Sequence, residues 1–215
     1  MRRRLPAVLA AALALTLLAA CRTHVGAAAF VAHTRISESD VRQYVDPHGP
    51  SAQALAQAQQ SGGTLNARTE ATSILVTDLV FREVLSQRNL LPNAAALRQL
   101  HDPALAFFGA QSGGAQIDAT LSTSLQANGL KPTLLPKLLD NYELEYVLIQ
   151  KINAQTLAEL SKAVAAANVP ISVSPAYGTW DPANVRVGSA PLPAFLNTKL
   201  TYTPGAPSSS PSATG

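Results

Sequence analysis

Few side chains in this sequence have types and spacing suited to chemistry. The chain has one cysteine, Cys21, and four histidines, His24, His33, His48 and His101. A lone thiol can serve as a nucleophile, a metal ligand or an acceptor for a covalent group, but it cannot form a disulfide within the chain. None of the histidines has a second candidate ligand at metal-binding spacing, so each is interpreted as a solvated polar residue. The sequence therefore predicts no metal site and no cofactor.

Other catalytic patterns receive no support from the sequence. Glu143 and Glu145 are two apart in a predicted helix, so their side chains diverge by about 200° and do not form a carboxylate pair. The glycine pairs at 62–63 and 113–114 lack the preceding strand and following helix of a phosphate-binding loop, and they are interpreted as hinges. No nucleophile with a neighbouring base can be named. We therefore predict that the protein is not an enzyme.

Cys21 closes an N-terminal segment that has the pattern of an export signal. Arg2 to Arg4 precede an apolar run from Leu5 to Ala20, which ends in small residues directly before the cysteine. The run is shorter than the roughly 20 apolar residues that span a bilayer. The pattern resembles a bacterial lipoprotein signal. We expect residues 1–20 to be a signal peptide and Cys21 to be lipidated, which would anchor the exported protein in the lipid bilayer at the outer face of the cytoplasmic membrane. An ordinary signal peptide, with no role for Cys21, is the alternative.

The charge balance gives no reason to expect a nucleic-acid partner. The chain has Lys+Arg 16 and Asp+Glu 13, and without Arg2 to Arg4 the two signs are equal. No stripe of basic residues with interleaved aromatics and no zinc-finger spacing is present. We therefore predict no binding to nucleic acid.

The rest of the chain divides into a domain and two flanking segments. Residues 21–27 are expected to be a short lipidated spacer, and residues 28–190 are long enough for one domain with a hydrophobic core. Residues 191–215 are rich in proline and serine. After residue 203 they contain almost only Pro, Ser, Gly, Ala and Thr, so this end is expected to be disordered.

Apolar spacing predicts a mostly helical domain. Ser37 and Asp40 have the spacing of a capping box for a first helix, and helices are expected at Ser51–Gln60 and Asn66–Asn89. Two short helices are expected next, one capped by Asn93 and one opened by Asp102-Pro103, and another follows Gly114. Helical spacing from about Thr133 to Asn168 then predicts one continuous helix on the order of 50 Å long.

Two extended segments flank these helices. They are Ala28–Ile36, with a possible turn at His33-Thr34, and Ile171–Ser174. A lone short strand has no partner for its backbone hydrogen bonds, so we expect the two segments to pair and to join the start and the end of the domain. After the second segment, Tyr177 and Trp180 are expected to pack this strand pair onto the helices, because the only Trp of a small domain is usually well buried.

The order of these elements resembles a known family. A short strand, a helix led by Arg35-Ile36-Ser37, a long final helix and the segment Pro175-Ala176-Tyr177-Gly178-Thr179-Trp180-Asp181 are similar to the SurA/PrsA-type N-terminal chaperone domain. The resemblance covers most of Ala28 to Val187 and is nearest to lipoprotein members, although Ser174 and Ala176 replace the usual Asn and Arg. It implies a SurA N-terminal-like helical domain with a long C-terminal helix and a small β-pair.

The resemblance also implies a function. Longer relatives carry a parvulin-type prolyl isomerase domain near the end of the long helix, for which this chain has no room. The expectation is a membrane-anchored extracytoplasmic chaperone of the holdase type, whose partners are unfolded or nascent exported proteins. An apolar groove between helices would bind them, and the candidate contact residues are Phe107, Phe108, Tyr177 and Trp180. An envelope scaffold lipoprotein with one dedicated protein partner is the alternative, because a fold alone does not decide function.

Overall fold

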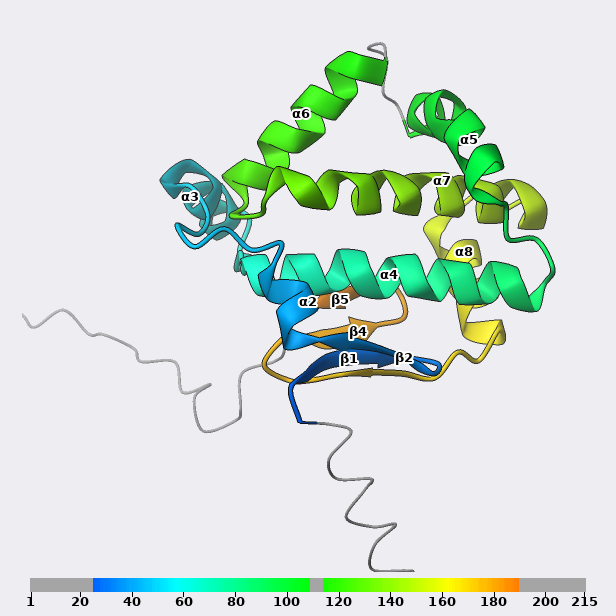
Figure 1. Cartoon of the computed structure of the whole chain (residues 1–215), viewed down its shortest axis with the longest axis horizontal. Coiled ribbons are helices and arrows are strands. Elements are labelled where there is room, and N and C mark those ends of the chain that lie inside the picture. Colours follow the sequence, from blue (N-terminus) through cyan, green and yellow to red (C-terminus); the bar gives the residue numbers. More distant parts are fainter. Residues whose placement is uncertain (1–24, 109–113, 190–215) are drawn as a thin grey trace, which may run out of the picture.

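The computed structural model describes residues 25–108 and 114–189 of the chain, and these residues form a mostly helical domain with a small antiparallel sheet (Figure 1). The predicted signal peptide, Cys21, His24 and the Pro/Ser-rich segment lie outside the described residues. Within the described ranges no helix has both the length and the apolar character needed to cross a membrane.

The two ends of the domain meet in a three-stranded sheet. Strands β1 (Ala27–Val31) and β2 (Thr34–Ser37) form a hairpin, and β3 (Ile171–Val173) pairs with the other edge of β1. The predicted pairing of the two extended segments is therefore confirmed, with Ala29 opposite Val173. The hairpin turn lies one residue earlier than expected, at Ala32-His33, where Ala32 adopts a positive φ of 50°.

The first two helices begin at serine caps, and the cap at Ser37 was predicted from the sequence. Helix α2 (Glu38–Arg42) has a complete capping box, in which Ser37 accepts a hydrogen bond from the Asp40 N–H and the Asp40 carboxylate accepts one from the Ser37 N–H. Helix α3 (Ala52–Gln60) is capped by Ser51. The segment between them is held by the 128–131 turn, because the Asp46 N–H donates to Gly129 O and the Lys131 N–H to Tyr44 O.

Helix α4 (Ala67–Gln87) confirms the clearest apolar pattern in the sequence. Helix α5 (Ala94–Phe107) differs from the prediction, because one continuous helix replaces the two short ones and carries Pro103 inside it. Both Pro103 and Gln99, four residues earlier, are exposed. Proline has no N–H to donate to the Gln99 carbonyl, but water can bind this carbonyl because it lies at the surface. The helix therefore tolerates a proline at position 103. Helix α6 (Gly114–Ala127) follows.

The prediction of one long C-terminal helix is wrong. The chain instead forms a short 3₁₀ turn, η1 (Pro132–Leu134), followed by α7 (Leu135–Ile152) and α8 (Leu157–Ala166). Asn153 ends α7 in the left-handed region, at φ 54° and ψ 41°. Thr156 then starts α8 with a capping box that includes Glu159. The apolar spacing continues through this break, which is why periodicity alone did not locate it.

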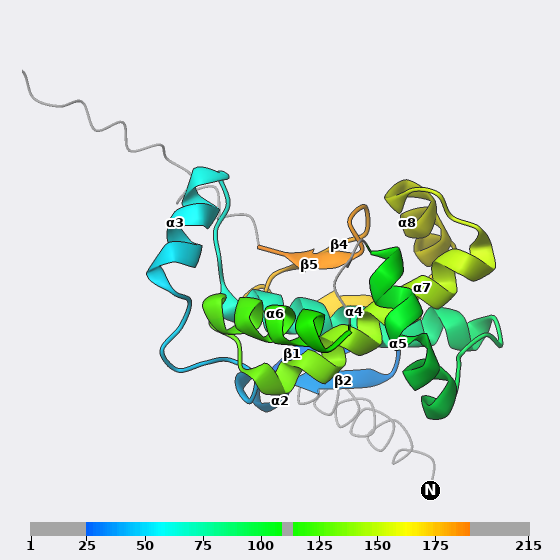
Figure 2. The ribbon, with the colours of Figure 1, turned by 90° about the horizontal axis from the view of Figure 1, so that it is seen from above.

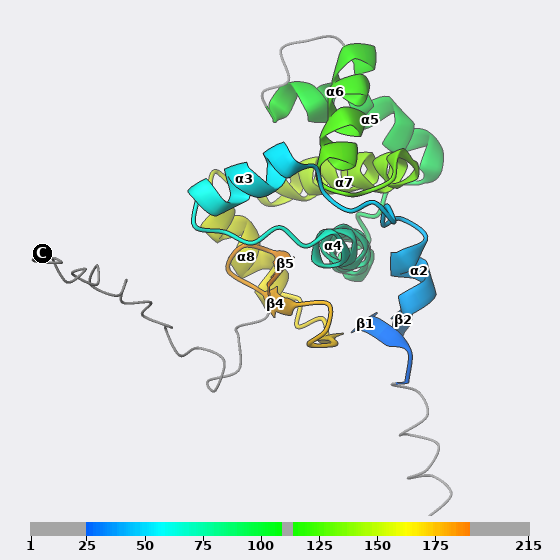
Figure 3. The same cartoon turned by 90° about the vertical axis from the view of Figure 1, so that its left-hand side faces the viewer.

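These elements are stacked in layers around α4. In Figure 3, α5 and α6 lie above α7, α7 lies above α4, and the strands lie below α4. Seen from above in Figure 2, β2 lies on one side of α4, and a hairpin of β4 (Thr179–Asp181) and β5 (Arg186–Gly188) lies on the other side. Helix α4 is buried on more than one face, through Ala67, Thr69, Ala71, Thr72, Val76, Asp78, Val80, Phe81, Val84 and Leu85.

The second hairpin, β4 (Thr179–Asp181) with β5 (Arg186–Gly188), is attached to α4 by side chains of that helix. The Val187 N–H donates to the Ser73 hydroxyl over 3.0 Å, and the Thr77 hydroxyl donates to Val185 O over 3.3 Å. Val185 and Val187 are themselves buried. The segment after β3 is thus part of the folded core.

Gly178 lies where β4 approaches α4 most closely. Its φ is +128°, a conformation that residues with a side chain rarely adopt. A Cβ atom at this position would collide with the carbonyl oxygen of Gly188 and would lie 2.6 Å from Cγ1 of Val187. A glycine at position 178 is therefore needed for the hairpin to close against the helix.

Gly178→Ala is expected to destabilise the domain by on the order of 3 kcal/mol, because it adds backbone strain to a clash with buried atoms. Gly188→Ala is the matched control in the same hairpin, since a Cβ there meets nothing within 4 Å. Chemical denaturation of both variants measures the difference. Equal stability of the two variants would contradict the packing described for this turn.

Candidate functional site

The four aromatic residues proposed from sequence as contact residues lie in two separate places. Phe107 and Phe108 lie at the end of α5, whereas Trp180 lies in β4 and Tyr177 directly precedes that strand. Helices α7 and α4 lie between these two regions in Figures 1 and 3. One surface cannot include all four residues.

Tyr177 and Trp180 have structural positions. Tyr177 is 5% exposed and belongs to the main hydrophobic core. Trp180 packs against that core and is only partly buried, so the expectation that the sole Trp is well buried is wrong for this residue. Its ring lies in a short edge hairpin rather than between layers. The cost of Trp180→Ala should therefore lie below the roughly 3 to 5 kcal/mol of a fully buried ring.

Phe107 and Phe108 form an exposed aromatic patch with two tyrosines of α7. The Phe107 and Phe108 rings are edge-to-face at 5.2 Å, Phe107 contacts Tyr146 at 5.5 Å, and Phe108 contacts Tyr142 at 5.3 Å between ring centroids. Phe107 is 48% exposed and Phe108 is 38% exposed. We call these four residues the aromatic patch. Rings held in this geometry offer apolar faces at the surface without needing to reorganise first.

Local sequence explains how the patch is built. Tyr142 and Tyr146 are four apart in α7, so they lie on one face of that helix. Phe107 is the last residue of α5 and Phe108 is its C-cap, and the change of direction at the helix end lets two consecutive rings reach the same neighbouring helix. The sequence analysis identified the two phenylalanines as candidates but not the two tyrosines. Their i, i+4 spacing is the signal that would have identified them.

His101 does not have the solvated position that its sequence context suggested. It lies between three helices, with Nδ1 3.4 Å from a carboxylate oxygen of Glu143 on α7 and Nε2 3.5 Å from one of Asp118 on α6. The contact with Glu143 is a hydrogen bond, whereas the Asp118 Oδ1 atom has no hydrogen-bond partner among the described residues. Burial raises the pKa of Glu143, and its hydrogen bond with His101 opposes that rise. His33 and His48 are exposed, as expected. Because α5 is one continuous helix, it carries His101 to its inner side.

A group of ion pairs attaches α7 to α4. The Arg82 guanidinium pairs with Asp78 over 2.9 Å and with Asp140 over 2.7 Å, and the Lys137 ammonium lies 3.3 Å from Asp78. The Asp78 side chain is almost fully buried. Nearby, the Asn141 amide donates to Ile74 O over 2.9 Å. These contacts fix the helix that carries the two tyrosines.

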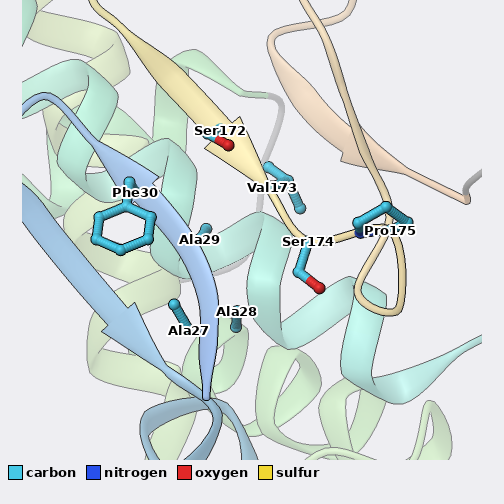
Figure 4. Close-up of a pocket in the computed structure, with 8 residues that line it drawn as sticks. All are labelled: Ala27, Ala28, Ala29, Phe30, Ser172, Val173, Ser174 and Pro175. Atoms are coloured by element: carbon cyan, nitrogen blue, oxygen red, sulfur yellow. The ribbon is translucent and has the colours of Figure 1, made fainter. Parts of the chain in front are cut away.

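Two hollows of the surface are less suited to a specific ligand than the aromatic patch. One, of about 360 Å³, lies between α4, α5 and α7, and its Arg82 and Arg98 are balanced by Asp140 and Glu143. The other, of about 260 Å³, lies between β1 and β3 and is lined by residues 27–30 and 172–175 (Figure 4). Its lining consists of apolar side chains and two serines, with no charged group. Across the described part of the chain, no three His, Cys, Asp or Glu side chains form a group able to hold a metal ion.

Glu145 is a partly buried carboxylate beside the aromatic patch. It lies three residues after Tyr142, on the same side of α7. Burial raises the pKa of Tyr142, and the charge of Glu145 raises it further. Within residues 25–108 and 114–189 Glu145 has no hydrogen bond and no ion pair. Burial raises the pKa of Glu145 from its ordinary value of 4.5 to about 7. The patch is therefore bordered by a carboxyl group that forms no ion pair with a cation of the described residues.

Comparison with known proteins gives no relative. No protein-family model, no curated protein and no solved structure matches the chain. The resemblance to the SurA/PrsA-type domain therefore rests on the sequence pattern alone.

Glu145→Gln is expected to stabilise the domain in a pH-dependent manner. The pKa of Glu145 is about 7 in the folded state against an ordinary value of 4.5, so folding binds a proton between these values and stability falls as pH rises through them. At pH 8 the variant should be more stable than wild type by up to about 3 kcal/mol, and near pH 4 the two should be equal.

Denaturation curves at pH 4 and pH 8 test this expectation. Asp102→Asn, which removes an exposed carboxylate of α5, is the control and should show no such difference between the two pH values. A Glu145→Gln variant that is no more stable than wild type at pH 8 would show that this carboxylate is well solvated.

Proposed function

We propose that this protein is an extracytoplasmic, lipid-anchored chaperone of the holdase type, which binds unfolded or nascent exported polypeptides through the aromatic patch. The observation that carries the proposal is the exposure of Phe107 and Phe108 beside Tyr142 and Tyr146. Paired aromatic side chains at a surface are a common means of holding apolar polypeptide segments.

The location of the patch supports weak binding of many segments. Its two phenylalanines are exposed at the end of α5, the helix above α7 in Figure 1, so an extended chain can reach them without entering the core. The patch presents ring faces, which favours binding with little selection of side-chain shape. Such binding would delay aggregation without tight affinity.

The membrane anchor is proposed from the sequence. Arg2 to Arg4, the apolar run to Ala20 and Cys21 together resemble a lipoprotein signal. A diacylglycerol linked to the Cys21 thiol would carry two chains, which is enough for stable anchoring. The protein would then be held at the membrane face where exported polypeptides emerge.

Phe107→Ala combined with Phe108→Ala is expected to weaken suppression of aggregation. Because the variant removes the two most exposed rings, about five times more protein should be needed to delay aggregation of a chemically unfolded model protein to the same extent. The measurement is light scattering with residues 22–215. Leu55→Ala is the matched control, since Leu55 has an exposure similar to that of Phe108 but lies on α3.

Two results would contradict the proposed function. One is no suppression by the wild-type protein even in excess. The other is equal suppression by the double variant and the wild type, which would remove the patch from the binding role. Crosslinking in envelope extracts distinguishes the alternative function, because a dedicated scaffold would yield one stoichiometric partner instead of many unrelated exported proteins.

Cys21→Ser is expected to abolish anchoring, because serine has no thiol to accept the lipid. In detergent phase partitioning the wild type should enter the detergent phase, and the variant should remain unprocessed or enter the aqueous phase. Partitioning of both proteins into the aqueous phase would refute the lipid anchor and leave an ordinary export signal.

A further inference from the structure

Glu145 differs from the other partly or fully buried carboxylates near the upper helices. Asp78 and Asp140 pair with Arg82, and Asp118 and Glu143 contact His101. Each of these carboxylates thus has a nitrogen partner within the domain. Glu145 has none among the described residues, although it loses part of its hydration in the fold. Removing a carboxylate from water without a compensating partner costs free energy.

The position of Glu145 in the fold indicates where a cationic partner for its carboxylate would bind. Tyr142 precedes it by three residues on the same side of α7, and the Tyr142 ring contacts Phe108. The carboxylate is therefore at the border of the aromatic patch. Aromatic ring faces attract ammonium and guanidinium groups, and a neighbouring carboxylate adds a charge of the opposite sign.

From this arrangement we infer that the aromatic patch and Glu145 form one binding site for polypeptide segments that carry a Lys or Arg side chain next to apolar or aromatic residues. This inference rests on the proposed function and names the class of segment that the site selects. The rings bind the apolar side chains, and the Glu145 carboxylate pairs with the basic group. Charge complementarity thus makes a basic segment the favoured occupant, ahead of a neutral or acidic one.

A double-mutant cycle tests the pairing directly. The probes are two short fluorescent peptides of leucine and phenylalanine, identical except for a central Lys in one and a central Gln in the other. Binding to the purified protein is measured by fluorescence anisotropy at low salt. Wild type should bind the Lys peptide more tightly, and Glu145→Gln should weaken that binding by about 3- to 10-fold while leaving the Gln peptide unchanged.

Asp102→Asn is the matched control, because it removes a negative charge from the same part of the domain without touching the patch. It should change neither affinity. If Asp102→Asn weakens binding of the Lys peptide as much as Glu145→Gln does, the attraction is a general charge effect and the inference fails.

The remaining outcomes separate the inference from the proposed function. If wild type binds both peptides equally and Glu145→Gln changes neither affinity, the patch binds apolar segments but Glu145 does not favour the basic peptide. That result overturns only the inference. If wild type binds neither peptide, the patch is not a polypeptide-binding surface, and both the inference and the proposed function are overturned.

Discussion

Packing on two sides of α4 is the constraint on which the rest of the fold depends. On one side, α7 is held by the Arg82–Asp140 and Lys137–Asp78 ion pairs and by the Asn141 amide. On the other side, β5 is held by Ser73 and Thr77, and the β1–β3 sheet packs below. A helix covered in this way must be apolar on more than one face, and where it is polar its groups must be hydrogen-bonded. The sheet at the domain ends and the upper helices are therefore coupled through a single element.

The candidate site takes its geometry from that coupling. Tyr142 and Tyr146 lie on α7, whose position is fixed from below by the ion pairs to α4, so half of the aromatic patch belongs to a rigid helix. Phe107 and Phe108 come from the end of α5, which His101 links to α6 and α7 through long contacts with two carboxylates. One side of the patch is thus firmly placed and the other is held by weaker interactions. Such a combination suits a surface that must accept segments of different shape.

Local signals in the sequence predicted much of the fold. Ser37 and Asp40 formed their capping box, the apolar spacing after Asn66 became α4, and the extended segments at the domain ends paired. The break between α7 and α8 was missed although Thr156 and Glu159 have capping-box spacing, because the apolar pattern runs through it. The site was harder to predict, since the contacts of Phe108 with Tyr142 and of His101 with Asp118 join residues from different helices. Helix packing decides such contacts, and no local pattern encodes them.

The central claim is that unfolded polypeptides bind at the aromatic patch and not at the β4–β5 hairpin. Site-specific photocrosslinking tests it most directly, with a photoreactive phenylalanine analogue placed either at Phe108 or at the exposed Thr179 of β4. With an unfolded client present, the account predicts strong crosslinks from position 108 and background levels from position 179. Equal crosslinking from the two positions, or crosslinking from position 179 alone, would contradict it.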